Sequence, residues 1–284
     1  MRKLALVLGC LLFAFGNHSA DAQEPSPKPD IFYLPTPQRV VDVMLLMAQV
    51  KKDDLLYDLG SGDGRLVITA AKRYGARGIG IEIDPRLLDL AKRNAARTKV
   101  EDKVEFRQAD LFQSDFKDAD VITLYLLDTL NERLRPQIFA QVKPGTRIVS
   151  HAFHMGEWIP DAERKLTIQG KPYEAYLWIV PANISGRWKL TRDAKVKGLP
   201  DEVLVEQTFQ DFIMRTADGS TVLGEGIVNG TEFYVTLPEG TRGKATRFTG
   251  KIDGNRINAV LPEQGQKWQG ERKPGTEKPI EPVK

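Results

Sequence analysis

The sequence predicts an α/β domain built on a mostly parallel sheet, followed by a smaller all-β domain. Up to about residue 181, apolar strand-like segments alternate with amphipathic helix-like segments. This alternation is typical of a parallel sheet covered by helices on both faces. Residues 185–261 contain only short alternating runs separated by Gly, Asn and Asp, which indicates a small antiparallel sheet or barrel.

The segment from Leu55 to Asp84 is the most informative part of the first domain. An apolar strand leads into a glycine-rich turn, and the turn opens an amphipathic helix that ends at Gly75. The first turn of that helix offers free N–H groups to a ligand. A second apolar strand ends at Glu82, where a carboxylate can accept hydrogen bonds from both hydroxyls of a ribose. A structural reason for an acid at this place is hard to find, so we expect it to contact a ligand.

The spacing of the glycines narrows the kind of ligand. Gly60, Gly62 and Gly64 follow Asp58 in the pattern G-x-G-x-G, and glycine allows positive φ and a close approach of ligand to backbone. No Lys-Ser/Thr follows, which argues against a phosphate-binding P-loop, and the third glycine of G-x-G-x-x-G is missing. The run DLGSGDG resembles motif I of class I S-adenosylmethionine-dependent methyltransferases.

This resemblance implies the cofactor and a set of residues that bind it. S-adenosylmethionine would lie over Asp58, Gly60 and Gly62, and Glu82 matches the ribose-binding acid of the family. A third strand, over residues 104–110, ends in Asp110, and many members of the family place an Asp there to contact the adenine amino group. By position, Asp110 takes that role.

The later elements follow the order of the same family. Strands are expected over residues 121–126 and 147–153, and helices over residues 85–96 and, despite Pro136, 130–142. Two strands at residues 165–169 and 174–180 resemble the antiparallel hairpin that closes the family's sheet. The resemblance therefore implies a Rossmann-like seven-stranded methyltransferase sheet.

A finer resemblance lies upstream of the glycine turn. The segment Tyr33-Leu-Pro-Thr36-Pro37 precedes an amphipathic helix, as in the family of mitochondrial ATP synthase c-subunit lysine methyltransferases and their bacterial relatives. In that family the segment folds over the cofactor, so Tyr33, Thr36 and Pro37 are further candidates for cofactor binding. The resemblance also implies a protein lysine as methyl acceptor and a possible association of the substrate with membranes.

Four residues at strand ends are candidates for the acceptor side of the site. Tyr125 and Asp128 follow the fourth strand, and His151 and His154 follow the fifth. Either histidine could accept a proton, or could simply be hydrogen-bonded near the edge of the sheet. Asp128 could equally cap the helix that follows. Two histidines without a pattern of carboxylates make a poor metal site, so no metal is expected.

Composition excludes several kinds of chemistry. The formal net charge of +3 is small for 284 residues and no dense basic tract is present, which does not favour nucleic acid. No Asn-Pro-Pro-Tyr follows the fourth strand, which argues against methylation of nucleic-acid bases or glutamine. Cys10 is the single cysteine, so disulfides and a thiol nucleophile are not expected in a chain that is processed after it.

The domain organisation follows from these segments and from the termini. Residues 1–22 are typical of a signal peptide, with Arg2 and Lys3 before an apolar run, and predict export to the periplasm; an uncleaved membrane anchor is the alternative. A proline-rich linker (23–30), the methyltransferase domain (31–181), the β domain (182–269) and a disordered tail (270–284) are expected to follow. Gly186-Arg187-Trp188 resembles the start of lipocalin-type barrels.

Three functions remain open at this point. The first is a methyltransferase acting on a protein lysine, with a β domain that recruits the substrate. The second is an exported binding or scaffold protein that retains the fold without turnover. The third is a small-molecule methyltransferase. The oligomeric state does not follow from the sequence.

Overall fold

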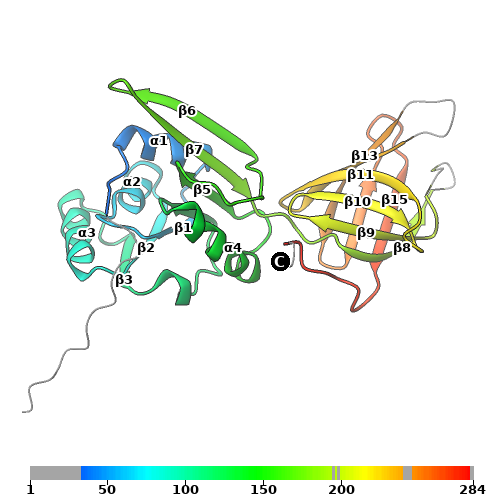
Figure 1. Cartoon of the computed structure of the whole chain (residues 1–284), viewed down its shortest axis with the longest axis horizontal. Coiled ribbons are helices and arrows are strands. Elements are labelled where there is room, and N and C mark those ends of the chain that lie inside the picture. Colours follow the sequence, from blue (N-terminus) through cyan, green and yellow to red (C-terminus); the bar gives the residue numbers. More distant parts are fainter. Residues whose placement is uncertain (1–32, 194–195, 197–198, 239–244, 282–284) are drawn as a thin grey trace, which may run out of the picture.

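The chain folds into an α/β domain and a β-barrel domain joined by a short connection (Figure 1). This computed structural model describes residues 33–281 except 194–195, 197–198 and 239–244. The expected signal peptide and proline-rich linker therefore lie outside the described residues. Among the helices of the described part of the chain, none is long and apolar enough to cross a membrane.

The α/β domain is built on a seven-stranded sheet with the order β3-β2-β1-β4-β5-β7-β6. Strands β1 to β5 run parallel to one another, and β7 lies antiparallel between β5 and β6. The predicted Rossmann-like methyltransferase sheet is confirmed. Its strands are β1 (Leu55–Leu59), β2 (Arg77–Glu82), β3 (Val104–Gln108), β4 (Val121–Leu124), β5 (Arg147–His151), β6 (Ala162–Ile168) and β7 (Lys171–Ile179).

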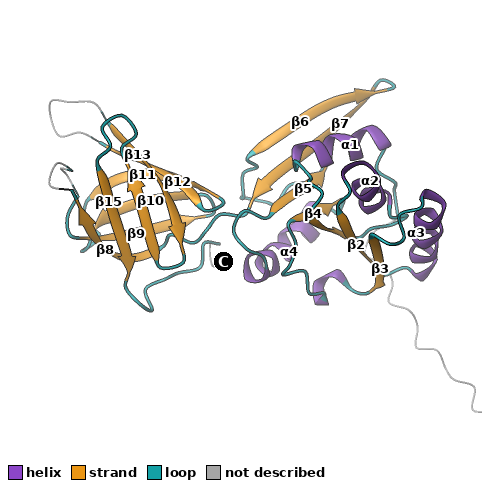
Figure 2. Cartoon of the chain, turned by 180° about the vertical axis from the view of Figure 1, so that it is seen from behind, coloured by secondary structure: helices purple, strands orange, loops and turns teal. Residues whose placement is uncertain are grey.

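Helices cover both faces of this sheet (Figure 2). Helices α1 and α2, with part of α3, bury one apolar cluster against it. Helix α4 and the segment around Phe116 bury a second cluster on the opposite face. The helices are α1 (Gln38–Met47), α2 (Arg65–Tyr74), α3 (Pro85–Thr98) and α4 (Asp128–Gln141), with a 3-10 turn η1 (Leu111–Gln113). Helix α4 contains Pro136, as predicted, and begins two residues earlier than expected.

The glycine turn has the local geometry that its sequence predicts. Gly60, Gly62 and Gly64 all have positive φ, and Gly64 forms the left-handed N-cap of α2. Gly75 ends the same helix in the left-handed region. This turn directs the N-terminus of α2 towards the carboxyl ends of the parallel strands, where open α/β sheets bind their ligands.

The second domain is a closed eight-stranded barrel in which each strand pairs with the next and β15 pairs with β8. Its interior is filled by large side chains, among them Trp188, Phe248 and Trp268. The guanidinium of Arg272 lies 4.8 Å from the ring centroid of Trp188. The strands are β8 (Gly186–Arg192), β9 (Glu202–Thr208), β10 (Asp211–Thr216), β11 (Val222–Asn229), β12 (Glu232–Leu237), β13 (Thr246–Asp253), β14 (Arg256–Val260) and β15 (Lys267–Arg272).

The prediction of a disordered tail over residues 270–284 is wrong for residues 270–272 and for Ile280. Residues 270–272 complete β15, and Ile280 is buried with its carbonyl accepting a hydrogen bond from the backbone N–H of Phe209. Charged and proline-rich composition suggested disorder, but pairing with β8 and β14 satisfies the backbone of these residues.

Candidate active site

A pocket of about 1120 Å³ opens at the carboxyl ends of β1, β2 and β4. Typical small-molecule sites hold roughly 300–1,000 Å³, so this pocket has room for a cofactor and part of an acceptor. Eight of the predicted site residues line it: Tyr33, Thr36, Asp58, Gly60, Gly62, Glu82, Asp110 and Tyr125. The other four, Pro37, Asp128, His151 and His154, do not appear among its lining residues.

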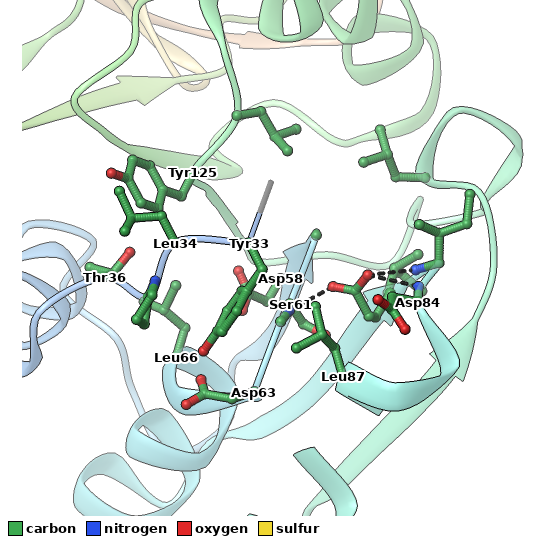
Figure 3. Close-up of a pocket in the computed structure, with 18 of the residues that line it drawn as sticks. Tyr33, Leu34, Thr36, Asp58, Ser61, Asp63, Leu66, Asp84, Leu87 and Tyr125 are labelled. Carbon is green, nitrogen blue, oxygen red and sulfur yellow. Dashed lines mark hydrogen bonds between the residues drawn. The ribbon is translucent and has the colours of Figure 1, made fainter. Parts of the chain in front are cut away.

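Glu82 is held at the end of β2 by backbone N–H groups. One carboxylate oxygen accepts from Gly62 at 2.8 Å, and the other accepts from Ile83 and Asp84 at 2.9 Å (Figure 3). These bonds supply the structural reason that sequence analysis did not find, and they fix the carboxylate on the wall of the pocket. A carboxylate has about four acceptor positions, so capacity remains for a ribose hydroxyl.

Tyr33 folds over the glycine turn. A Cβ atom on Gly62 would lie 2.5 Å from the Tyr33 ring, so only glycine at position 62 permits this contact. Burial and the charge of Asp63 raise the pKa of the Tyr33 hydroxyl. Figure 3 shows Tyr33 between Leu34 and Asp63, above the turn. The segment before α1 therefore forms one wall of the pocket.

Arg65, which sequence analysis did not single out, ties this segment to the turn. Its Nη1 donates to the Thr36 carbonyl at 2.6 Å, while Nε and Nη2 donate to the Asp63 carboxylate at 2.9 and 2.7 Å. Burial would raise the pKa of Asp63, but the hydrogen bonds and charge of Arg65 outweigh it and leave that pKa lowered. Asp63 thus holds the loop in this structure. Pro37 only precedes α1, where its carbonyl accepts from Val40 and Val41.

Asp58 lies at the floor of the pocket and is 2% exposed. Burial is the main cause that raises its pKa to about 8, opposed by a hydrogen bond from Thr123, whose hydroxyl donates to Oδ1 at 2.7 Å. The nearby carboxylates of Glu82 and Asp63 raise it further. A carboxyl with this pKa is mostly neutral at pH 7 and becomes anionic most readily when a cation arrives beside it.

Asp110 lies two residues after the end of β3, on the side of the pocket where β2 and β3 end. Its carboxylate accepts from the backbone N–H of Phe112 at 2.8 Å and thereby caps η1. Phe112 also lines the pocket, and the guanidinium of Arg133 lies 3.8 Å from the centroid of its ring. The side of the pocket next to Glu82 therefore combines an acid with a flat aromatic surface, as an adenine base requires.

The opposite side of the pocket is apolar. Tyr125 stacks on His151 with centroids 3.9 Å apart and lies 5.9 Å from the ring of Phe153. His151 is buried behind Tyr125, where its Nδ1 lies 3.1 Å from the hydroxyl of Thr36. Burial lowers the pKa of His151 to about 4, so the imidazole is uncharged at neutral pH. Together with Tyr125 and Phe153, Leu34 and Leu127 form an apolar rim on this side of the pocket; Leu34 is 65% exposed and Leu127 is 45% exposed.

Asp128 and His154 lie together, but away from the pocket. The Asp128 carboxylate accepts from the backbone N–H of His154 at 2.6 Å, and the imidazole of His154 stacks on Tyr176 with centroids 4.0 Å apart. Asp128 is the first residue of α4 rather than its N-cap. In this structure both residues hold the loop after β5, and the residue of that loop that reaches the pocket is Phe153.

These features define a class I S-adenosylmethionine-dependent methyltransferase. The sheet places an acid at the end of β2, a glycine turn at the end of β1 and an acid after β3 around one pocket large enough for the cofactor. When bound, the cofactor supplies an electrophilic methyl group on a sulfonium. Among the described residues, no group of three or more His, Cys, Asp or Glu side chains could hold a metal ion.

Comparison with known proteins supports this class. Residues 58–162 match the ANTKMT methyltransferase domain family. A protein-lysine N-methyltransferase of Saccharolobus islandicus is 37% identical over 153 residues, which cover 54% of this chain and 95% of that protein. The ATP synthase c-subunit lysine N-methyltransferase of Rattus norvegicus is 29% identical over 129 residues, which cover 45% of this chain and 59% of that protein.

A solved structure is also similar. An RNA methyltransferase from Salinibacter ruber in complex with S-adenosyl-L-homocysteine is 54% identical and has a TM-score of 0.50, covering 53% of this chain and 96% of that one. The chain belongs to the methyltransferase family of the Saccharolobus protein, nearly all of which it covers. These matches span about half of the chain, and the family match ends at residue 162, before the barrel begins.

Proposed function

We propose that this methyltransferase acts on lysine side chains of proteins. The observation that carries the proposal is the apolar rim on the acceptor side, formed by Leu34, Tyr125, Leu127 and Phe153, backed by the uncharged His151. A lysine must lose its proton before it can attack, and apolar surroundings lower the pKa of an amine that enters them. The rim therefore favours the reactive form without a dedicated base.

The chemistry requires little else from the protein. The lone pair of the neutral lysine Nζ forms the new bond to the methyl carbon as the carbon–sulfur bond breaks. The methylated ammonium that results then loses a proton to water. The protein positions the two reactants in line and excludes water from between them. Tyr125 and Phe153 flank the apolar path along which the aliphatic part of a lysine would reach the pocket.

The names of the relatives support a protein substrate and supply one rival. The Saccharolobus and Rattus proteins are described as lysine methyltransferases, whereas the Salinibacter protein is described as an RNA methyltransferase. RNA methylation is therefore the second candidate. The small net charge of +3 and the sequence Leu124-Tyr125-Leu126-Leu127 in place of Asn-Pro-Pro-Tyr favour the protein substrate.

The test uses S-adenosylmethionine labelled in its methyl group. The full chain is incubated with cell extract, and the products are divided, treated with protease or ribonuclease, and analysed for methylated lysines after acid hydrolysis. The Glu82→Gln variant is the control, because it changes the predicted ribose contact and leaves the acceptor rim intact. Methyllysine in the protein fraction supports the proposal. Ribonuclease-sensitive label, or label only in low-mass products, would overturn it; cofactor binding without any transfer would favour the scaffold function.

We further propose that the amino terminus directs the enzyme out of the cytosol and that its substrates include membrane-associated proteins. The basic and apolar pattern of residues 1–22 supports export. The exposed Leu34 and Leu127 beside the pocket suit an acceptor lysine that has apolar neighbours. Fusion of residues 1–40 to a reporter active only outside the cytosol tests export, and a silent reporter would refute it. Separating labelled protein into soluble and membrane fractions tests the substrate.

A further inference from the structure

The hairpin turn between β9 and β10 of the barrel has an unusual local conformation. Only Phe209 and Gln210 lie between the paired residues Thr208 and Asp211, and Phe209 has φ +51°. A two-residue hairpin turn with positive φ at its first residue normally has glycine, asparagine or aspartate there. A bulky aromatic residue in this region is disfavoured and persists only when its surroundings hold it.

Ile280 and Gln207 hold the backbone of Phe209 by hydrogen bonds, whereas the methyltransferase domain holds its side chain. Its side chain is buried, stacked on Trp158 with centroids 6.0 Å apart and on Phe139 of α4 at 6.1 Å. The guanidinium of Arg135, also from α4, lies 5.0 Å from the centroid of the same ring. Phe209 is thus part of the apolar cluster under the sheet of the other domain.

The same contacts hold the loop that follows β5, residues 152–159. Arg135 donates from Nη1 to the carbonyl of Met155 at 2.5 Å, and Gln210 donates from Nε2 to the carbonyl of Ile159 at 2.9 Å. Trp158 belongs to the loop itself. Helix α4 fixes its middle, because Asn131 donates to the carbonyl of His154 at 3.0 Å. The loop is therefore held from α4 on one side and from the barrel turn on the other.

This loop carries Phe153, which lines the acceptor side of the pocket beside Tyr125. We propose that the barrel completes the acceptor side of the active site through its β9–β10 turn, with Phe209 as the positioning residue for the 152–159 loop. The proposal rests on the methyl-acceptor role assigned to this rim. It predicts that loosening the turn weakens binding of the acceptor while cofactor binding, on the other side of the pocket, is preserved.

Two other roles of the barrel make different predictions. If the barrel only stabilised the fold, loss of Phe209 would lower the melting temperature without a selective change in KM for the acceptor. If the barrel recruited substrate through its outer face, truncating an exposed aromatic residue there would raise KM for the acceptor more than the loss of Phe209 does. Tyr234, which is partly exposed on β12 with Arg247 over its ring, provides that matched aromatic control.

The experiment compares Phe209→Ala, the milder Gln210→Ala and the control Tyr234→Ala in the full chain. Hydrogen exchange by mass spectrometry measures protection of residues 152–159 and of the glycine turn. Steady-state kinetics use reduced, alkylated α-lactalbumin as acceptor, and calorimetry measures the Kd for S-adenosylmethionine. For Phe209→Ala we expect faster exchange confined to the loop and KM for the acceptor raised about tenfold, with kcat and the cofactor Kd within about twofold. Gln210→Ala should shift the same quantities in the same direction by less.

The outcomes separate this inference from the proposed function. Unchanged loop exchange, or an acceptor KM unchanged in both Phe209→Ala and Gln210→Ala, would overturn the role of the turn. A larger effect of Tyr234→Ala would assign recruitment to the outer face instead. If the wild-type chain methylates only small molecules, the lysine proposal fails, and KM for that small acceptor, measured with the same variants, still decides the role of Phe209.

Discussion

The buried Asp58 carboxyl should give the free energy of unfolding a characteristic dependence on pH. In the unfolded chain this carboxyl ionises near pH 3.8, whereas in the folded chain burial raises its pKa to about 8. Between these values the folded state binds the extra proton. The free energy of unfolding is therefore highest, as far as Asp58 is concerned, below about pH 4, where its carboxyl is neutral in both states. It decreases as pH rises towards 8.

The magnitude follows from the size of the shift. Each pH unit within the window changes the free energy of unfolding by about 1.4 kcal/mol, so raising pH from 5 to 8 should destabilise the fold by roughly 4 kcal/mol through this group. Asp58→Asn cannot ionise, yet its carbonyl oxygen can still accept from the Thr123 hydroxyl. Relative to wild type, the variant should gain roughly 4 kcal/mol of stability across the same range.

Urea unfolding of both proteins at several pH values, followed by tryptophan fluorescence, measures this difference. Taking variant minus wild type at each pH cancels the other titrating groups. Asp118→Asn, at an exposed acid of the same domain, serves as the control for replacing a carboxylate by an amide at the surface. Parallel curves for wild type and Asp58→Asn would show that Asp58 is ionised in the folded protein and would refute the reasoning.

Three further variants test the rest of the site. Glu82→Ala should weaken S-adenosylmethionine binding on the order of 100-fold in calorimetry by removing a charged acceptor of a ribose hydroxyl; unchanged affinity in a folded variant would exclude the ribose role. Gly62→Ala should push the Tyr33 ring away and lower the free energy of unfolding by about 1–2 kcal/mol, a loss that Tyr33→Ala should partly relieve if the clash is the cause. Burial lowers the pKa of His151 from 6.5 to about 4, so between these pH values the unfolded chain binds one proton more than the folded chain. The free energy of unfolding of wild type should therefore fall by roughly 1.4 kcal/mol for each pH unit as pH drops from 6.5 to 4. A His151→Gln variant that loses stability at the same rate would contradict this.

Sequence patterns predicted the cofactor side of the site because its geometry is local. Strand, glycine turn, helix and strand follow one another within Leu55 to Asp84, so spacing alone places Glu82 opposite the turn. The resemblance to a methyltransferase family added Tyr33 and Thr36, and the structure brings both to the same pocket. How these residues contact the cofactor stays a prediction.

The acceptor side could not be predicted as well, because it depends on contacts between distant segments. His154 and Asp128 follow strands, as site residues often do. The backbone N–H of His154, however, donates to the Asp128 carboxylate 26 positions away in sequence, and the His154 ring stacks on Tyr176. These contacts hold the loop after β5 instead of forming the pocket. The Phe209-Gln210 turn carries no glycine or asparagine that would mark it, and its conformation depends on packing against the other domain and on a hydrogen bond to the distant Ile280. The buried Ile280 likewise depends on a partner in the barrel.

The barrel is tied to the catalytic domain at three separate points along the chain, and this bears on how the protein can be engineered or can evolve. Besides the β9–β10 turn, the β11–β12 turn lies against the methyltransferase domain, since a Cβ on Gly230 would lie 3.3 Å from the Cα of Gly145, and Glu281 pairs with the buried Arg135 at 2.7 Å. Truncation near residue 181 would uncover the apolar faces of Phe139 and Trp158 and leave a buried guanidinium without its carboxylate. We therefore expect the catalytic half, produced alone, to aggregate unless Arg135 and its aromatic neighbours are replaced, so that the barrel is a condition for the solubility of the catalytic half.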